Sequence, residues 1–110
     1  MLSKEERLKR VDFNRFFSSG RRFHHAYFTL IYAPYPSPHI AVVVSKKIAN
    51  RATARNKIRR KMYDILRHHI RSADHAGICI LIVKKEALTA SHSALREALI
   101  SMFGKAERNY

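Results

Sequence analysis

Apolar residues recur along the chain with two different periods, which predict three helices and three main strands. Spacings of three and four residues predict helices over about Glu6–Ser18, Ala52–Arg71 and Ser91–Phe103. Runs rich in aromatic and β-branched residues predict strands over Phe23–Ala33, Ile40–Ser45 and Ile78–Val83. Residues just after Gly20 are a candidate for a short extra strand. The alternation of elements therefore indicates a mixed αβ protein.

Proline and glycine residues divide these elements. Pro34, Pro36 and Pro38 predict a loop, because proline cannot donate to a strand ladder, and we expect the strands on either side to pair as a hairpin. Gly104 is expected to end the last helix. The element order predicts an α+β sandwich, written αββ(β)αβα, with one small mixed sheet packed against helices.

The strand Ile78–Val83 is apolar at nearly every position, which is typical of a strand covered on both faces. Together with the strand and helix before it, it forms a predicted parallel crossover. The general rule makes such crossovers right-handed. No linker or repeat interrupts the chain, so we expect residues 1–110 to form a single domain.

The charge of the chain indicates which class of partner it binds. The chain has 22 Lys and Arg against 8 Asp and Glu, a formal net charge of +14. No acidic residue occurs from Phe13 to Tyr63. Such a chain repels itself unless a polyanion lies against it. The clustering of charge in one stretch favours a phosphate-binding surface.

The second predicted helix carries much of this charge. Arg51, Arg55 and Arg59 are four residues apart and align along the helix, at its amino-terminal end. Lys57, Arg60 and Lys61 point into solvent, and Lys46 and Lys47 precede the helix. A merely solvated helix would mix charge signs, and a DNA-reading helix would come with a zipper, paired metal ligands or a helix-turn-helix. RNA is therefore the favoured polyanion.

Aromatic residues suggest a second surface. They are dense on the first helix and first strand: Phe13, Phe16, Phe17, Phe23, Tyr27, Phe28 and Tyr32. Strand alternation places Tyr27, Thr29 and Ile31 on one face and Phe28 on the other. Aromatic rings beside a basic groove can stack unpaired bases, although each ring also fits a hydrophobic core.

The residues do not indicate a catalytic or metal site in the protein. The eight acids are scattered, without the close cluster that two-metal phosphodiester chemistry needs. The histidine pairs at 24–25 and 68–69 are adjacent, so their side chains point in different directions. Cys79 is alone, which fits a reducing cytosol. The chain also lacks a signal peptide and a long apolar run, so we expect a cytoplasmic protein. From the scattered acids and histidines, we expect that it binds no metal or cofactor by itself.

The stretch from Val44 to Arg60 resembles the signature of the ribonuclease P protein family. That signature is an apolar strand ending in Ser/Ala-Lys-Lys, followed by an Arg-Asn-Arg-type helix, here Arg55-Asn56-Lys57. The opening Arg7–Gly20 and the closing Ile80–Leu99 are also similar to the family, so the resemblance covers nearly the whole chain.

The resemblance implies an accessory protein subunit of a ribonucleoprotein endoribonuclease. In that family the protein binds a large catalytic RNA and the 5′ leader of precursor tRNA. The RNA holds Mg²⁺ and performs the hydrolysis that gives mature tRNA 5′ ends. The expected partners are therefore the catalytic RNA and precursor tRNA, with no membrane and no obligate protein partner. The resemblance also implies a left-handed crossover, against the general rule.

Site residues follow position by position. With the two cations Arg51 and Lys61 of the same helix, the expected RNA-binding residues are Lys46, Lys47, Arg51, Arg55, Asn56, Lys57, Arg59, Arg60 and Lys61. The expected leader-binding cleft is formed by Phe13, Phe17, Thr29 and Ile31. This chain departs from the family pattern at Lys57, at Tyr63-Asp64 and at Ile31, where arginine, Arg-Glu and tyrosine are frequent.

Three other functions remain open from the sequence. A ribosomal or assembly protein would also be a basic RNA binder, and it would copurify with ribosomal RNA. A stand-alone nuclease would cleave without RNA. A peripheral membrane protein would need an amphipathic surface helix with exposed aromatics, whereas the helices here have apolar stripes suited to a core.

Overall fold

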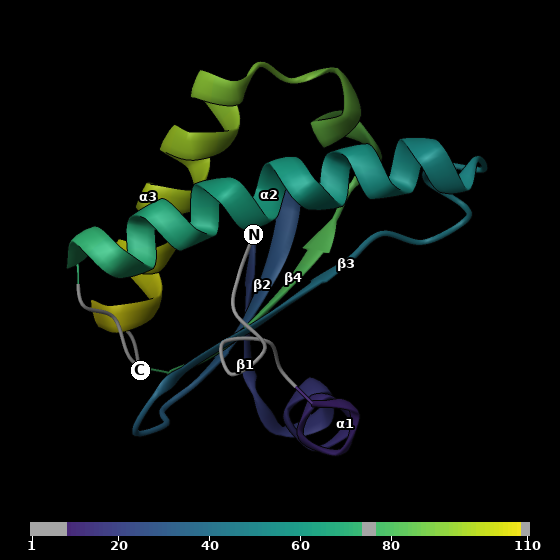
Figure 1. Cartoon of the computed structure of the whole chain (residues 1–110). Helices are drawn as coiled ribbons and strands as arrows, with labels where there is room; N and C mark the ends of the chain where they lie inside the picture. The colour runs from purple at the N-terminus through teal and green to yellow at the C-terminus, as the bar shows by residue number, and fades with distance from the viewer. Residues whose placement is uncertain (1–8, 74–76, 109–110) are drawn as a thin grey trace.

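The computed structural model describes residues 9–73 and 77–108. Its elements, shown in Figure 1, follow the order α1 (Arg10–Ser19), β1 (Arg21–His24), β2 (Phe28–Ala33), β3 (Pro38–Val43), α2 (Ala52–Ala73), β4 (Gly77–Val83), a 3₁₀ helix η1 (Lys85–Thr89) and α3 (His92–Arg108). The predicted α+β order is confirmed. The start predicted for the first helix, Glu6, lies outside the described residues.

The four strands form one mixed sheet in the order β1-β2-β4-β3. Strand β4 pairs antiparallel with β2, where Leu30 faces Leu81, and parallel with β3, where Val42 faces Leu81. The predicted hairpin between β2 and β3 is therefore wrong, because β4 lies between them. All but one residue of β4 is buried. This burial fits a strand inside the sheet, where both of its faces are covered.

Helices cover the two faces of the sheet unequally. Figure 1 shows α1 on one face and α2 and α3 on the other. The larger core lies beneath α2 and α3 and joins strand residues such as Phe28 and Leu81 to Met62, Leu66 and Phe103 of the helices. A smaller core lies beneath α1: Phe16, Ile31, Ala33, Ile78 and Ile80. The β3–α2–β4 connection is the predicted parallel crossover, and its left hand stays a prediction.

Several predicted boundaries shift. The long strand expected over residues 23–33 is two antiparallel strands, β1 and β2, so the extra strand after Gly20 is confirmed. A short turn joins them, in which the His25 amide donates to the Phe28 carbonyl at 2.8 Å. Gly104 does not end α3, because continuing the helix buries Ala106 completely in the core. Val11 of α1, although apolar, is 80% exposed.

Two glycines let neighbouring groups approach the backbone closely. A Cβ on Gly20 would overlap Ile31 Cγ2 and lie 2.8 Å from the Phe16 carbonyl oxygen, so α1 lies directly on β2 only because residue 20 has no side chain. Gly77 begins β4 at a φ of +135°, which favours glycine, with the Tyr32 ring against it. Within the described ranges, none of the helices is long and apolar enough to cross a membrane.

Candidate nucleic-acid interface

The predicted RNA-binding residues lie in one continuous part of the fold, which we call the cationic ridge. It comprises Lys46, Lys47, Arg51, Arg55, Asn56, Lys57, Arg59, Arg60 and Lys61. The ridge begins in a tight turn after β3, where the amides of Ile48 and Ala49 donate to the Ser45 carbonyl at 3.1 and 3.2 Å. Lys46 and Lys47 occupy the turn and are exposed. Because α2 begins at Ala52, the two lysines lie close to the positive end of its dipole.

Two arginines of the ridge have contacts within the protein. The Arg55 guanidinium donates to the Ala49 and Asn50 carbonyls at 2.9 and 2.8 Å and so holds the chain that leads into α2. Arg59 donates to the Asn56 side-chain oxygen at 3.0 Å. Both arginines are half-buried. Arg55 therefore has a structural role in addition to its charge.

Most of the rest of the ridge faces solvent, whereas Lys61, predicted to point into solvent, is half-buried. Lys46, Lys47, Arg51, Lys57 and Arg60 are all exposed. Within residues 9–73 and 77–108, no carboxylate pairs with a cation of the ridge. Its positive charge is therefore not neutralised by the part of the chain that the structure describes, and a polyanion would neutralise it with release of counterions.

Aromatic residues of α1 form a second surface at the other side of the sheet. The rings of Phe13 and Phe17 stack with centroids 5.5 Å apart. Arg22 of β1 places its guanidinium 4.8 Å from the Phe17 ring centroid and donates to the Phe17 carbonyl at 3.1 Å. Both phenylalanines are half-buried, so each keeps part of its ring accessible. A flat aromatic surface next to a cation suits an unpaired base and its phosphate.

The strand register defines what lies beside these rings. One row crosses the whole sheet on the α1 side, from His24 through Thr29 and Ile82 to Val43. Ile82 and Val43 are half-buried and, like Phe13 and Phe17, pack against the smaller core. We call Phe13, Phe17, Ala41, Val43 and Ile82, the partly buried side chains around that core, the α1 face.

The two predicted floor residues differ in accessibility. Ile31 has no exposed surface, because α1 and Gly20 cover it, so it supports the α1 face from below rather than lining it. Thr29 is 7% exposed, and its hydroxyl is 3.3 Å from His24 Nδ1. The tyrosine frequent in the family at position 31 is absent here, and Tyr32 packs on the opposite face against the larger core.

Sequence reasoning missed several polar residues near the two surfaces. Strands β1, β3 and β4 run in the same direction, so their carboxyl ends lie at the same end of the sheet. Basic residues follow each of them. Lys84 donates from Nζ to the His25 carbonyl at 2.7 Å, which ties β4 to the turn after β1. His24 and Lys85 are exposed at the same end. The sequence contained a signal for these residues, because basic residues that follow strands of the same direction lie together at one end of a sheet. The contact of Arg22 with Phe17 had no such signal.

Comparison with known proteins decides the family. A family model described as Ribonuclease P matches residues 2–107. The chain belongs to the ribonuclease P protein family. Among curated members of the family, the ribonuclease P protein component of Desulfosudis oleivorans is 32% identical over 97% of this chain and 90% of its own length. The corresponding component of Azoarcus sp. is 32% identical over 90% of this chain and 84% of its own.

Solved structures of ribonuclease P proteins share the fold. The protein from Thermotoga maritima is 25% identical with a TM-score of 0.77, covering 88% of this chain and 94% of that one. A Staphylococcus aureus mutant protein with defective mRNA degradation activity is 24% identical with a TM-score of 0.81, covering 94% and 90%. As a ribonuclease P family member, the chain therefore carries the family's mixed sheet and three helices.

One departure from the family pattern has a structural explanation. Tyr63 stands where the family frequently has arginine, and its hydroxyl accepts a hydrogen bond of 3.2 Å from the Val42 amide. Strand β3 is at the edge of the sheet, so this hydroxyl satisfies a backbone donor that no further strand can reach. In this ribonuclease P protein, position 63 thus serves the fold.

Within the described residues, no group of three or more His, Cys, Asp or Glu side chains is placed to hold a metal ion.

Proposed function

We propose that this protein is the accessory subunit of a ribonuclease P holoenzyme in the cytoplasm, where it binds the catalytic RNA and the 5′ leader of precursor tRNA. The RNA subunit holds Mg²⁺ and performs the hydrolysis. The protein binds the catalytic RNA and the leader and so positions the precursor tRNA for cleavage. Family membership supports the partnership with the RNA, and the two surfaces support the division of tasks.

The observation that carries the proposal is the cationic ridge, whose cations pair with no carboxylate among residues 9–73 and 77–108. Two folded RNAs repel each other, and a basic protein between them lowers that repulsion and the Mg²⁺ concentration that assembly requires. The exposed cations Lys46, Lys47, Arg51, Lys57 and Arg60 contact phosphates of the catalytic RNA. Arg55, bonded to the Ala49 and Asn50 carbonyls, holds the local backbone in place for these neighbours, and Arg59 holds the Asn56 side chain.

The α1 face binds the leader, which is single-stranded. Phe13 and Phe17 offer stacked rings to unpaired bases, and Arg22 beside Phe17 offers a cation to the neighbouring phosphate. The half-buried Ile82 and Val43 form the apolar floor beside the rings. A mature tRNA has no leader, so it does not use this surface.

The decisive experiment is reconstitution of the full chain with a bacterial catalytic RNA, assayed on precursor and mature tRNA. We expect Phe17→Ala to weaken holoenzyme binding of precursor tRNA by about 5- to 150-fold, since loss of base stacking costs about 1–3 kcal/mol. Mature tRNA binding should be unchanged. Val11→Ala, a truncation on the exposed side of the same helix, is the matched control and should leave both affinities unchanged.

Three outcomes would contradict the proposal. Equal loss for precursor and mature tRNA would remove leader binding from the α1 face. Failure of the wild-type protein to lower the Mg²⁺ requirement of any catalytic RNA, together with specific binding of ribosomal RNA, would replace the function with that of a ribosomal assembly protein. Cleavage by RNA-free protein would instead indicate a stand-alone nuclease.

A further inference from the structure

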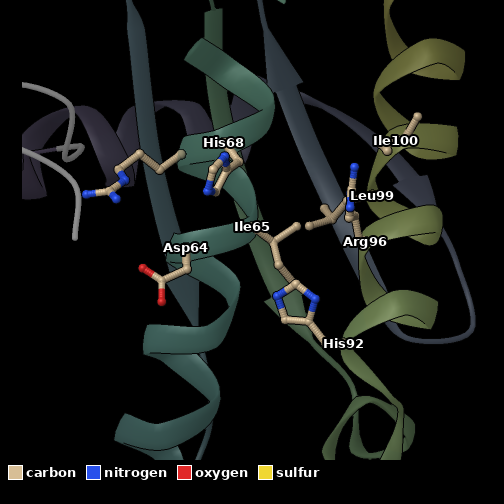
Figure 2. Close-up of a pocket in the computed structure, with 8 residues that line it drawn as sticks. Asp64, Ile65, His68, His92, Arg96, Leu99 and Ile100 are labelled. Atoms are coloured by element: carbon tan, nitrogen blue, oxygen red, sulfur yellow. The ribbon is translucent and has the colours of Figure 1, made fainter. Parts of the chain in front are cut away.

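A groove between α2 and α3 lies in the layer of the fold opposite α1. It has a volume of about 660 Å³ and is lined by Asp64, Ile65, Arg67, His68, His92, Arg96, Leu99 and Ile100. Figure 2 shows these side chains coming from the two helices. Figure 1 places α1 on the other side of the sheet, so this groove is separate from the α1 face. None of its residues belongs to the cationic ridge.

The groove combines an apolar floor with polar walls. Its floor is apolar: Ile65 and Leu99 are buried, while Ile100 is 46% exposed on the rim. Imidazoles stand on both walls, His68 on α2 and His92 on α3, and Figure 2 shows His92 reaching toward Ile65. Apolar floors with a few polar groups are typical of sites for small ligands or single groups of larger ones.

The charge of the groove favours an anion. Two arginines and one aspartate line it, and the Asp64 carboxylate points away from α3 in Figure 2. Asp64, Arg67 and His68 have further contacts within the protein. Within the described residues, the side chains of His92 and Arg96 have no such partner, so α3 supplies donors that a ligand can use. A guanidinium binds the oxygens of a phosphate as a planar fork.

The size of the groove distinguishes between two kinds of occupant. A volume of about 660 Å³ lies within the range of small-ligand sites, about 300–1,000 Å³. An amphipathic helix instead lays an apolar face along a groove, with anchors spread over two or more turns. A single base with its phosphate fits the same space, with the base on the apolar floor and between imidazoles, and the phosphate at Arg96.

From this geometry we propose that the α2–α3 groove binds one unpaired nucleotide of an RNA strand, at a site distinct from the cationic ridge and the α1 face. The base lies against Ile100 and the small exposed part of Ile65, with Leu99 beneath them, and Arg96 with His92 binds its phosphate. The protein then contacts RNA on both layers of the fold.

The site is tested on the full-length chain with ¹³C-labelled histidine, by following the imidazole signals of His68 and His92 in NMR titrations. His68→Gln and His92→Gln assign the two signals. We expect adenosine 5′-monophosphate to shift both signals saturably, and adenosine or inorganic phosphate alone to do so more weakly. A single-stranded trinucleotide should bind at least as tightly as the mononucleotide.

Charge reversal on α3 supplies the matched pair of variants. Arg96→Glu should weaken mononucleotide binding by about tenfold or more, because a charged hydrogen bond becomes a repulsion. Lys105→Glu, an exposed cation of the same helix outside the groove, should change it less than about twofold. The two imidazole signals report on the groove itself, so the result is independent of whether the α1 face binds the leader.

Four results would overturn the proposal: equal affinity of wild type and Arg96→Glu, equal responses to phosphate and mononucleotide, a mononucleotide response without a trinucleotide response, or a response to a polyglutamate peptide alone. The third would indicate a free nucleotide as the ligand, and the fourth an acidic protein segment.

Discussion

Replacing Gly20 by alanine tests how α1 is positioned over the sheet. A Cβ at residue 20 would overlap Ile31 Cγ2 and lie 2.8 Å from the Phe16 carbonyl oxygen. Favourable carbon–oxygen contacts are about 3.3–3.6 Å long. Neither neighbour can yield easily, because Ile31 is completely buried and the Phe16 oxygen accepts the Gly20 amide at 2.8 Å. The backbone conformation itself is ordinary, with φ of −69°, so the effect comes from contact alone.

We expect α1 to move away from β2 by about 0.5–1 Å and the free energy of unfolding to fall by about 1–3 kcal/mol, as for other overpacked cores. For a chain of this size that lowers Tm by roughly 5–20 °C. The displacement also shifts Phe13 and Phe17 relative to the sheet, so precursor tRNA binding by the holoenzyme should weaken while mature tRNA binding does not. Denaturant unfolding and tRNA affinity measure the two effects.

Two further variants isolate the cause. Gly104→Ala, inside α3, should stabilise the protein by about 0.5–1 kcal/mol, since alanine favours helix over glycine. Ile31→Ala removes the overlapping methyl group, so Gly20→Ala should cost less in that background, with a coupling energy of at least about 0.5 kcal/mol. Additive effects of the two substitutions, or a Gly20→Ala protein as stable as wild type, would refute the contact as the reason for glycine.

The remaining predictions concern α2. Tyr63→Phe removes the acceptor of the Val42 amide and should reduce the free energy of unfolding by about 0.5–1.5 kcal/mol in denaturant titrations, with unchanged catalytic-RNA affinity; an RNA-binding defect at unchanged stability would give Tyr63 a direct contact instead. Lys57→Ala should weaken catalytic-RNA binding and reduce the slope of log affinity against log salt by about 0.7–0.9, one phosphate contact. An unchanged slope would exclude Lys57 from the interface. Arg55→Ala is a less specific probe, because it also frees the carbonyls before α2.

Local periodicity predicted the elements well, and strand pairing poorly. The three- and four-residue spacing of apolar residues predicted α2, and the residues with that spacing, Ile58, Met62, Ile65 and Leu66, are all buried. Pairing failed because neighbouring strands along a chain usually pair, and the sequence contains no direct signal that β4 inserts between β2 and β3. The uniform apolarity of β4 was the available clue, since a strand buried on both faces belongs in the centre of a sheet.

The interface shows the same division. Charge density located the cationic ridge, because long charged side chains on a helix are exposed unless acids pair with them. It could not reveal that Arg55 turns back to the Ala49 carbonyl, or that Ile31 is covered, because both depend on tertiary packing. The α2–α3 groove combines residues about thirty positions apart, and neither helix alone predicts it.

Because β4 lies between β2 and β3, its synthesis determines when a growing chain can complete its sheet. β2 and β3 do not touch, so the sheet has no continuous ladder until residues 77–83 have been synthesised. On a ribosome, the basic segment around α2 emerges before the strand that anchors it. The nascent chain thus exposes its most cationic stretch before the sheet can be completed. Completion depends on the late strand β4, and pairings of such high sequence separation form slowly.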